Sequence, residues 1–427
     1  MFDTDFIFER TRRVIVLAIL AVTVQAAWAQ QVLLGVGMHV GGLTDQLLVA
    51  QLRRVEQTHL RSIRFDVSWK FVELVRGEYS MPSDIEHAVD EARAGGIEPV
   101  LILDYGNAFY DGGDKPRSRE AIEAFGRFSA FVVKHFRGRV NQFEVWNEWD
   151  NHTGGFPAAN AKDYAILFKA VYPLIRTANP EAKIIAGSGV HQGWEESLAE
   201  LGVIQMSDGI AVHPYNYQHA DGLAPEHCVQ GLMQLEERLS ASTGKHEVDL
   251  YVTEIGWPTN LGRFGASEEA IASYASRFTL LAGSLPYVKG VWWYDLKNDG
   301  TDSFEKEHNF GLYRADLTPK PAASTLAVAA NFAGEHLLTM LSRKTLGSGY
   351  VVIEATPVTK GVRKLLIWDA AQTGKRVQLE CDSVRGVRIR EDTSAGGISV
   401  PGMPAVVSAR DGQCEIRAID SLSVGVK

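Results

Sequence analysis

The chain contains 427 residues, of which 45% are hydrophobic, and its formal net charge is −9. This length allows a large buried core and exceeds that of one ordinary domain. The acidic excess is spread along the chain, and no basic stripe with interleaved aromatic residues is present. We therefore do not expect nucleic acid as a partner.

The N-terminal segment has the pattern of a secretory signal peptide. Arginines at positions 10, 12 and 13 precede an apolar run at 14–24, and the small-x-small sequence Ala27-Trp28-Ala29 follows. The run is too short to span a bilayer comfortably. We expect residues 1–29 to be cleaved and the mature protein to be exported to the periplasm or the medium, without a stable membrane span. An uncleaved N-terminal anchor is the alternative.

The chain has three cysteines. Cys381 and Cys414 both lie in the C-terminal region and could pair in an oxidising compartment. Cys228 would then remain as a small buried apolar residue. The odd count and the wide spacing argue against a metal site, so we expect neither a metal nor a cofactor.

From about residue 33, short β-rich runs alternate with helical segments. The expected strands are Leu33–His39, Leu60–Asp66, Glu98–Asp104, Asn141–Trp146, Lys183–Gly187, Gly209–His213, Leu250–Glu254 and Val288–Tyr294. The expected helices are Asp45–Gln57, Ser118–Phe136, Ala161–Thr177, Glu268–Leu281 and Pro321–Phe332. Such alternation predicts a (β/α)₈ barrel, which typically takes about 250 residues plus insertions. An open doubly wound sheet is the alternative, but the glycines around His39 lack the spacing of its phosphate loop.

From roughly Glu335 onward, short strand-like runs are separated by glycine and proline turns. These runs lie at Tyr350–Ile353, Lys364–Trp368, Arg376–Leu379 and Gly386–Ile389. The pattern predicts a small β-sandwich packed on the barrel. We therefore expect a catalytic barrel at 30–334 and a β-sandwich accessory domain at 335–427.

In a (β/α)₈ barrel, functional residues lie where strands end and the following loops begin. The candidate side chains at these positions are His39, Arg64, Asp66, Asp104, Tyr105, Trp146, Asn147, Glu148, His213, Tyr215, Glu254, Trp257, Trp293 and Tyr294. Glu148 and Glu254 each end an apolar β-run beside tryptophan. Because the fourth and seventh strands lie nearly opposite each other, both carboxylates can point into one cleft.

Two carboxylates surrounded by aromatic, histidine and arginine side chains indicate cleavage of a glycosidic bond. One carboxyl must be protonated to assist the leaving oxygen, and the other must be ionised to attack the sugar. Indole faces suit the C–H faces of sugar rings, and Asn, His and Arg side chains can hydrogen-bond sugar hydroxyls.

Four motifs resemble those of clan A glycoside hydrolases, with the greatest similarity to families 39 and 5. They are WNE at 146–148, HPY at 213–215, TEIGW at 253–257 and WW at 292–293. The segment EHNFGLYRADLTPKPA at 307–322 also resembles the approach to the last barrel helix in such enzymes. The resemblance covers most of residues 33–334, and a barrel followed by a β-sandwich is similar to the family 39 layout.

The resemblance implies that Glu148 is the acid/base, Glu254 the nucleophile and Asn147 a partner of the sugar 2-hydroxyl. Because the clan retains anomeric configuration, we expect the two carboxyl groups to lie about 5–5.5 Å apart. We also expect Arg64 to hold Glu254 ionised. Partial burial beside Trp146 is expected to raise the pKa of Glu148.

The resemblance further implies that Arg64 and Tyr215 orient Glu254, that His213 supports the site, and that Trp293 forms the floor of the cleavage subsite. Three further candidates for substrate contact have no assigned role: His39, Tyr105 and Trp257. Structural alternatives remain open for two residues. Arg64 could pair with Asp66 or Asp104, and His39 could be a core residue.

The function that these observations predict is retaining hydrolysis of a polysaccharide, with a bacterial exopolysaccharide as a candidate substrate, by a protein expected to be monomeric. Several tryptophans could serve as ring platforms, which favours endo-action. The alternative is a carbohydrate-binding protein that keeps the barrel cleft without catalysis. The pairing of Glu148 and Glu254 beside Asn147 favours the enzyme, because binding alone needs no matched acid and nucleophile.

Overall fold

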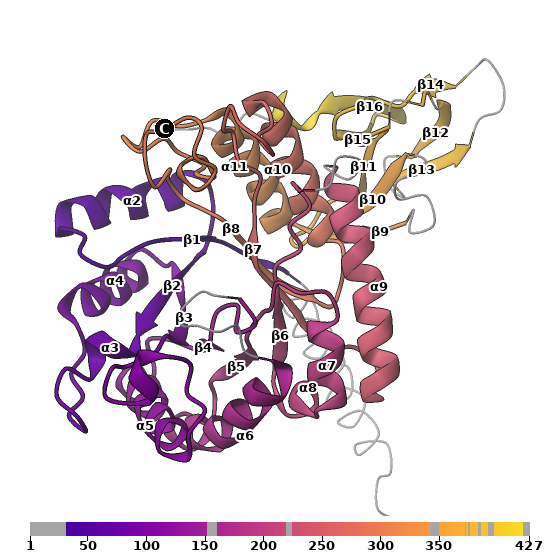
Figure 1. The fold of residues 1–427 in the computed structure, drawn as a ribbon. Helices are drawn as coiled ribbons and strands as arrows, with labels where there is room; N and C mark the ends of the chain where they lie inside the picture. The colour runs from indigo at the N-terminus through magenta and orange to yellow at the C-terminus, as the bar shows by residue number, and fades with distance from the viewer. Residues whose placement is uncertain are drawn as a thin grey trace, which may run out of the picture.

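A closed barrel of eight parallel strands forms the centre of the molecule, as seen in Figure 1. The computed structural model describes residues 31–151, 160–218, 224–341, 350–371, 373–374, 376–382, 386–391 and 397–421, so the expected signal peptide lies outside the described residues. The barrel strands are β1 (Leu33–Gly37), β2 (Ser62–Ser68), β3 (Glu98–Asp104), β4 (Gln142–Val145), β5 (Lys183–Ala186), β6 (Gly209–Val212), β7 (Leu250–Ile255) and β8 (Val288–Trp293). The predicted barrel is confirmed.

The barrel closes where β1 pairs with β8. Gly35 of β1 lies in register with Ser62 on one side and Trp292 on the other. A Cβ atom at Gly35 would lie only 2.4 Å from the indole nitrogen of Trp292. Glycine at this position therefore leaves room for a large side chain inside the barrel.

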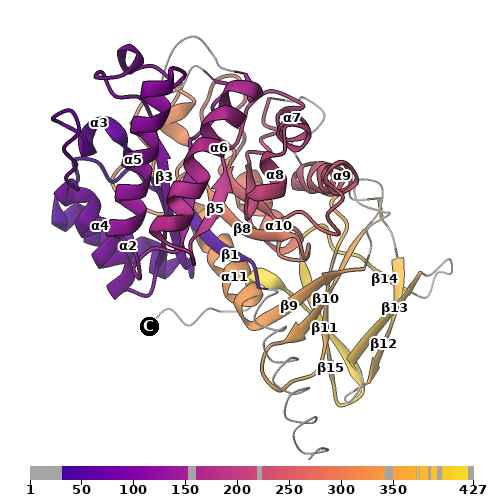
Figure 2. The ribbon, with the colours of Figure 1, turned by 90° about the horizontal axis from the view of Figure 1, so that it is seen from below.

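Helices follow each strand and cover the outside of the barrel, as Figures 1 and 2 show. They are α2 (Asp45–Gln57), α3 (Trp69–Val72), α4 (Ser83–Ala94), α5 (Arg119–His135), α6 (Ala161–Ala178), α7 (Trp194–Glu200), α8 (Val203–Met206), α9 (Pro225–Thr243), α10 (Glu268–Ala282) and α11 (Pro321–Glu335). All five predicted helices are present. Side-chain caps mark the start of four of them, since Thr44, Ser118, Asn160 and Ser267 each accept a hydrogen bond from a first-turn backbone amide.

Two sheets form the C-terminal β-sandwich. The larger sheet contains β9 (His336–Met340), β10 (Val351–Pro357), β11 (Lys364–Trp368), β15 (Ala405–Arg410) and β16 (Gln413–Ala418). The smaller sheet contains β12 (Arg376–Asp382), β13 (Gly386–Glu391) and β14 (Ile398–Ser399). A disulfide between Cys381 and Cys414 joins β12 to β16, with a Cα–Cα distance of 5.2 Å. Cys228 is buried and free.

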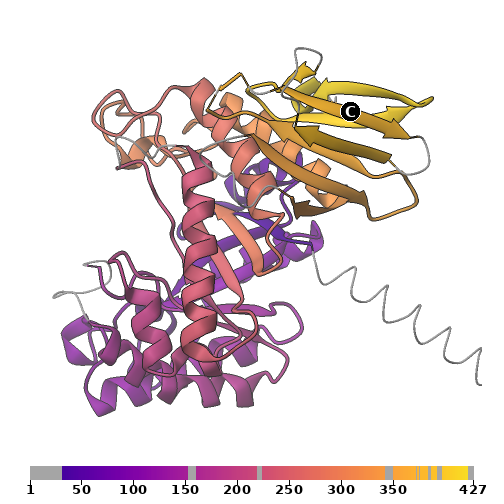
Figure 3. The ribbon, with the colours of Figure 1, turned by 90° about the vertical axis from the view of Figure 1, so that its right-hand side faces the viewer.

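The sandwich packs on the barrel beside α9, α10 and α11, as Figures 2 and 3 show. Ile353, Leu366 and Trp368 on one face of the larger sheet belong to the same buried cluster as the barrel core. The opposite face packs on the smaller sheet and forms a separate core. The expected division between 334 and 335 lies where α11 ends at Glu335 and β9 begins at His336. Within the described residues, no helix combines the length and apolar character needed to cross a membrane.

Candidate active site

A cavity of about 720 Å³ opens where the carboxyl ends of the barrel strands meet their loops. Its lining combines charged, aromatic and amide side chains, the mixture that orients a polar ligand in a concave site. The lining residues are Gly37, Met38, His39, Arg64, Phe65, Asp66, Ile102, Tyr105, Asn147, Glu148, Asn151, Val190, His213, Tyr215, Tyr217, Gln218, Glu254, Tyr294, Lys306, Glu307 and Phe310. This is the edge at which TIM-barrel sites lie.

Glu148 and Glu254 face each other inside this cavity. One carboxylate oxygen from each, together with a ring nitrogen of His213, lie within 4.8 Å of one another. The backbone just beyond β4 is unusual, because Trp146 and Glu148 have φ angles of 69° and 47°. Non-glycine residues rarely adopt this left-handed region, and such strain concentrates at functional sites. The chain therefore holds Glu148 in its position at some cost in backbone energy.

Arg64 of β2 connects several polar side chains on the inner side of the site. Its side chain is only 4% exposed and forms two hydrogen bonds to Glu144, at 2.7 and 3.2 Å. It also donates to Glu254 at 2.9 Å and to the side-chain oxygen of Asn147 at 2.8 Å. Burial works against the charged guanidinium, but the two carboxylates outweigh it and raise the pKa of Arg64. A permanently charged fork therefore fixes the orientation of Glu254 and Asn147.

His213 and Tyr215 hold the opposite side of the two carboxylates. His213 Nδ1 lies 2.9 Å from Glu148 and 3.6 Å from Glu254, and Nε2 lies 3.1 Å from the hydroxyl of Thr253. Burial disfavours the imidazolium, but the charges of Glu254 and Glu148 outweigh burial and raise the pKa of His213. Tyr215 donates its hydroxyl proton to Glu254 at 2.9 Å. The two glutamates are thus bonded to different sets of donors.

The prediction that the pKa of Glu148 is raised is wrong. Burial does favour the protonated carboxyl, but the hydrogen bond and charge of His213 and the hydrogen bond from Asn151 lower the pKa of Glu148 to about 2. Asn151 Nδ2 donates to Glu148 at 2.9 Å. The sequence places Trp146 next to Glu148, but the neighbour that decides its charge is His213, 65 residues away.

Eight predicted candidates line the cavity together with the two glutamates: His39, Arg64, Asp66, Tyr105, Asn147, His213, Tyr215 and Tyr294. Trp257 and Trp293 do not line it, and the prediction that Trp293 forms the floor of the cleavage subsite is wrong. Trp293 is buried against Trp257 and Phe278 on the helix side of the barrel. Strand alternation is the reason, because Trp292 takes the inward position of β8 and Trp293 the outward one.

Tyr294, just past the end of β8, takes the place in the cavity that was expected for Trp293. The other tryptophans near the strand ends, Trp69, Trp146 and Trp149, are also fully buried. The aromatic residues that line the cavity are therefore tyrosine and phenylalanine. Tyr105 follows β3, whereas Tyr217 and Phe310 lie in the loops after β6 and β8.

Glu144 is the main residue that the sequence interpretation missed. It is fully buried, and it alternates along β4 with Phe143 and Val145, which face the helices. The same alternation on β2 places Arg64 toward the barrel interior. Two ionisable side chains that point into the same barrel are stable only when they pair. Their inward positions could have been read from the alternation in the sequence. Tyr217 and Phe310 lie in long loops, where periodicity gives no comparable signal.

Asp66 and Asp104 form a second acidic pair at the barrel mouth. Asp104 is fully buried, and neither of its carboxylate oxygens accepts a hydrogen bond from the described residues. Burial, reinforced by the charge and contact of Asp66, raises the pKa of Asp104 well above its usual range. Burial beside Asp66, which lines the cavity, therefore favours the protonated form of Asp104. Arg64 hydrogen-bonds neither aspartate, contrary to the structural alternative considered above.

No family model matches the chain, and no curated protein matches it. Solved structures do match. A family 39 glycoside hydrolase from the gut symbiont Bacteroides cellulosilyticus WH2 has a TM-score of 0.69 and 24% identity, over 90% of this chain and 82% of that chain. GH5_18 from Streptomyces cattleya, in complex with GlcNAc, has a TM-score of 0.61 and 15% identity, over 71% and 81% of the two chains.

Native xylanase 10B from Thermotoga maritima also matches, with a TM-score of 0.53 and 18% identity over 72% of this chain and 97% of that chain. At these identities the likeness establishes the fold. The chain thus shares its fold with these glycoside hydrolases, which confirms the resemblance to families 39 and 5 at the level of the fold.

Proposed function

We propose that this protein is a retaining glycoside hydrolase in which Glu254 is the nucleophile and Glu148 the acid/base. The observation that carries the proposal is the approach of the two carboxylates to within 4.8 Å in one cavity. Retaining enzymes place their carboxyl groups about 5–5.5 Å apart, whereas inverting enzymes leave about 6.5–9.5 Å for a water molecule.

In the first step, the carboxylate of Glu254 attacks the anomeric carbon while Glu148 transfers a proton to the leaving oxygen. His213 supplies that proton to Glu148 through their hydrogen bond, because its raised pKa favours the protonated imidazole. Arg64 and Tyr215 fix the attacking carboxylate, so its orientation costs little at the moment of reaction.

In the second step, Glu148 accepts a proton from water, which attacks the glycosyl–Glu254 ester and releases the sugar with its original configuration. Glu148 can act as this base because His213 and Asn151 stabilise its carboxylate form. Asn147, whose oxygen is engaged by Arg64, presents its amide to the sugar bound beside Glu254.

We further propose a polysaccharide substrate, with a bacterial exopolysaccharide as the target, and endo-action. The expectation of endo-action was based on tryptophan platforms, which the structure does not place in the cavity. Its support is now that the cavity is lined by aromatic rings from separate parts of the barrel edge, Tyr105 after β3 and Tyr217 after β6. A chain that runs through the cavity would use both.

We also propose that the protein is exported and acts as a monomer. The disulfide between Cys381 and Cys414 supports export, because such bonds persist in oxidising compartments. Cleavage of residues 1–29 can be checked by N-terminal sequencing of the protein secreted by its host, and an intact leader in that protein would contradict it.

Replacement of Glu254 by Gln tests the assignment of the nucleophile. A Glu254→Gln protein should lose hydrolysis by a factor of at least about 10³ while it still binds the glycan, because the amide keeps the shape of the side chain but cannot attack. Turnover on a panel of purified bacterial and plant polysaccharides is the measurement. Unchanged turnover in the variant would refute the assignment. Binding without turnover by the wild-type protein would instead establish the carbohydrate-binding alternative.

The stereochemistry and the cleavage pattern need separate measurements. NMR of the first-formed anomer should show retention, and an inverted product would exclude the double displacement. Size profiling of early products should show oligosaccharides of several lengths. If monosaccharide alone is released from the first time point, endo-action is wrong.

A further inference from the structure

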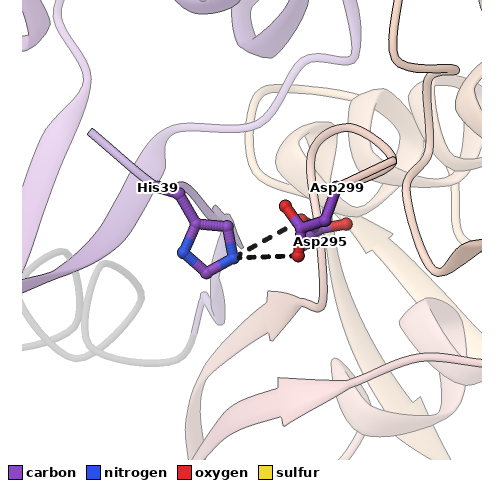
Figure 4. A group of neighbouring side chains, drawn as sticks. All are labelled: His39, Asp295 and Asp299. Atoms are coloured by element: carbon purple, nitrogen blue, oxygen red, sulfur yellow. Dashed lines mark ion pairs between the residues drawn. The ribbon is translucent and has the colours of Figure 1, made fainter. Parts of the chain in front are cut away.

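A second cluster of potential ligands lies at the edge of the cavity, apart from the two glutamates. It contains His39, just after β1, and Asp295 and Asp299, just after β8. Because β1 and β8 are neighbours in the closed barrel, their ends bring these side chains together. Figure 4 shows the Nε2 edge of the His39 ring facing both aspartates.

The distances from His39 to the two aspartates exceed the usual length of a charge-assisted hydrogen bond. His39 Nε2 lies 3.5 Å from Asp299 and 3.8 Å from Asp295, whereas His213 lies at the direct hydrogen-bonding distance of 2.9 Å from Glu148. Three ligands at about 2.1 Å from a tetrahedral ion lie about 3.4 Å from one another. The two distances from His39 are close to this separation, and the three ligand atoms all lie within 4.8 Å of one another.

Asp295 gives independent support for a bound cation. Its side chain is only 4% exposed, yet it accepts no hydrogen bond from the described residues and points toward His39. Among those residues, neither Asp295 nor Asp299 forms an ion pair with a lysine or an arginine. Buried carboxylates are normally paired, hydrogen-bonded or coordinated to a metal.

We propose that His39, Asp295 and Asp299 bind one Zn²⁺ ion, with a remaining coordination position that faces the glycan cavity. Imidazole together with carboxylate ligands suits Zn²⁺, and three protein ligands leave a position open. His39 is half exposed and lines the cavity, so a sugar hydroxyl can reach that position. This contact with a sugar rests on the proposed function, whereas the metal site itself does not.

Titration calorimetry of the tag-free, chelator-dialysed mature chain with ZnCl₂ tests the site. We expect one Zn²⁺ per wild-type chain, and binding weakened at least about tenfold by His39→Ala and by Asp299→Asn. Both side chains are partly exposed, so these variants should fold, which circular dichroism can verify. Asp295 is too deeply buried for a first test.

Two control variants separate this site from other histidine–carboxylate pairs. His87→Ala removes a surface histidine that lies 3.1 Å from Asp45, and Glu254→Gln alters the catalytic group. Neither should change Zn²⁺ binding. If the wild-type chain binds no Zn²⁺, or if His39→Ala binds it equally well, the proposed metal site is wrong and His39 forms only an ion pair with the two aspartates. Tighter binding of Ca²⁺ or Mn²⁺ than of Zn²⁺ would overturn the choice of ion.

The contact with the sugar is tested by hydrolysis with and without bound Zn²⁺. Metal removal should raise KM several-fold and change kcat little, since the ion would bind the sugar away from the reacting bond. An unchanged KM overturns this contact and leaves the metal site standing. If no variant hydrolyses any glycan, the proposed function fails, while the titration still decides the metal site.

Discussion

At the scale of single residues, the charge state of the site depends on contacts between distant parts of the chain. Glu148 and Glu254 have similar sequence contexts, because each lies at the end of a strand with a tryptophan within three residues. In the structure, Glu148 is bonded to His213 and Asn151, and Glu254 to Arg64 and Tyr215. Different donors therefore divide the two roles between chemically identical side chains.

Glu144 should be essential for positioning Arg64. A Glu144→Gln change keeps the size of the side chain but removes the charge that holds the guanidinium, so Arg64 can shift away from Glu254. We expect kcat to fall by up to about 100-fold with little change in KM, because misplacement of reacting groups has this cost. Steady-state kinetics of the folded variant are the measurement.

Gln142→Met is a matched control on the same strand, because Gln142 does not contact Arg64. It should keep kcat within a few-fold of the wild type. Equal kcat values for Glu144→Gln and the wild type would show that Arg64 needs no support from Glu144.

The pH profile of activity should report the shared proton of His213 and Glu148. Because the pKa of His213 is raised above 6.5, the pair keeps its proton to higher pH, and kcat/KM should fall only as pH rises beyond that value. In a His213→Gln variant the pKa of Glu148 itself governs this fall, which should move to lower pH. Measurement of kcat/KM between about pH 4 and pH 9 tests this. An unmoved alkaline limb would show that the proton does not come from this pair.

At the scale of elements, helix α6 sets the position of the end of β4. Tyr164 of α6 is fully buried, donates its hydroxyl to the carbonyl of Val145 and accepts from the amide of Gly187. One hydroxyl thus ties together the carboxyl ends of β4 and β5. Glu148 follows three residues after Val145, so its placement depends on the packing of a helix 13 to 30 residues further along the chain.

A Tyr164→Phe change should weaken both stability and catalysis. The change leaves two buried backbone groups without a partner, at a cost of about 1–3 kcal/mol in the free energy of unfolding. Denaturant unfolding and kcat are the measurements. Tyr172→Phe on the same helix is the control, because its hydroxyl accepts a hydrogen bond from the partly exposed side chain of Arg176 and from no backbone group of the described residues. If the two variants lose equal stability, the hydrogen bonds of Tyr164 to the ends of β4 and β5 contribute no more to the free energy of unfolding than the hydroxyl of Tyr172 does.

At the scale of the whole molecule, the barrel and the β-sandwich share buried contacts. Figure 3 shows the sandwich lying across α10 and α11. Glu226 at the start of α9 is 2% exposed, pairs with Arg277 of α10 and accepts a hydrogen bond from the indole of Trp368 in β11. A charged network therefore crosses the boundary between the two parts, and we expect them to unfold together.

Glu226→Ala should destabilise the whole chain. Loss of one partner of a buried ion pair costs about 3–5 kcal/mol, because Arg277 would remain buried without its carboxylate. Calorimetry should show a single transition at a lower temperature than in the wild type. Glu237→Ala, on the exposed side of the same helix, should change stability by no more than about 0.5 kcal/mol. Two separate transitions in the wild-type scan would contradict the coupling.

The order of elements and the two opposed glutamates could be predicted from the sequence, because they depend on local signals. Strand alternation, helix caps such as Ser118 and polar residues at strand ends are all read over a few positions. The direction of Trp293 and the pairing of Arg64 with Glu144 needed the barrel itself. Both depend on which face of a strand turns inward and on what lies across the interior.

The amino-acid sequence by itself determined eight strands, five of the helices that follow them and a carboxylate at the end of the fourth and seventh strands. Only the tertiary structure decided the charge of Glu148, the burial of the tryptophans and the meeting of His39 with Asp295 and Asp299. The physical reason is that secondary structure follows from neighbours along the chain. Electrostatic interaction and burial depend on distance in space, which barrel closure sets.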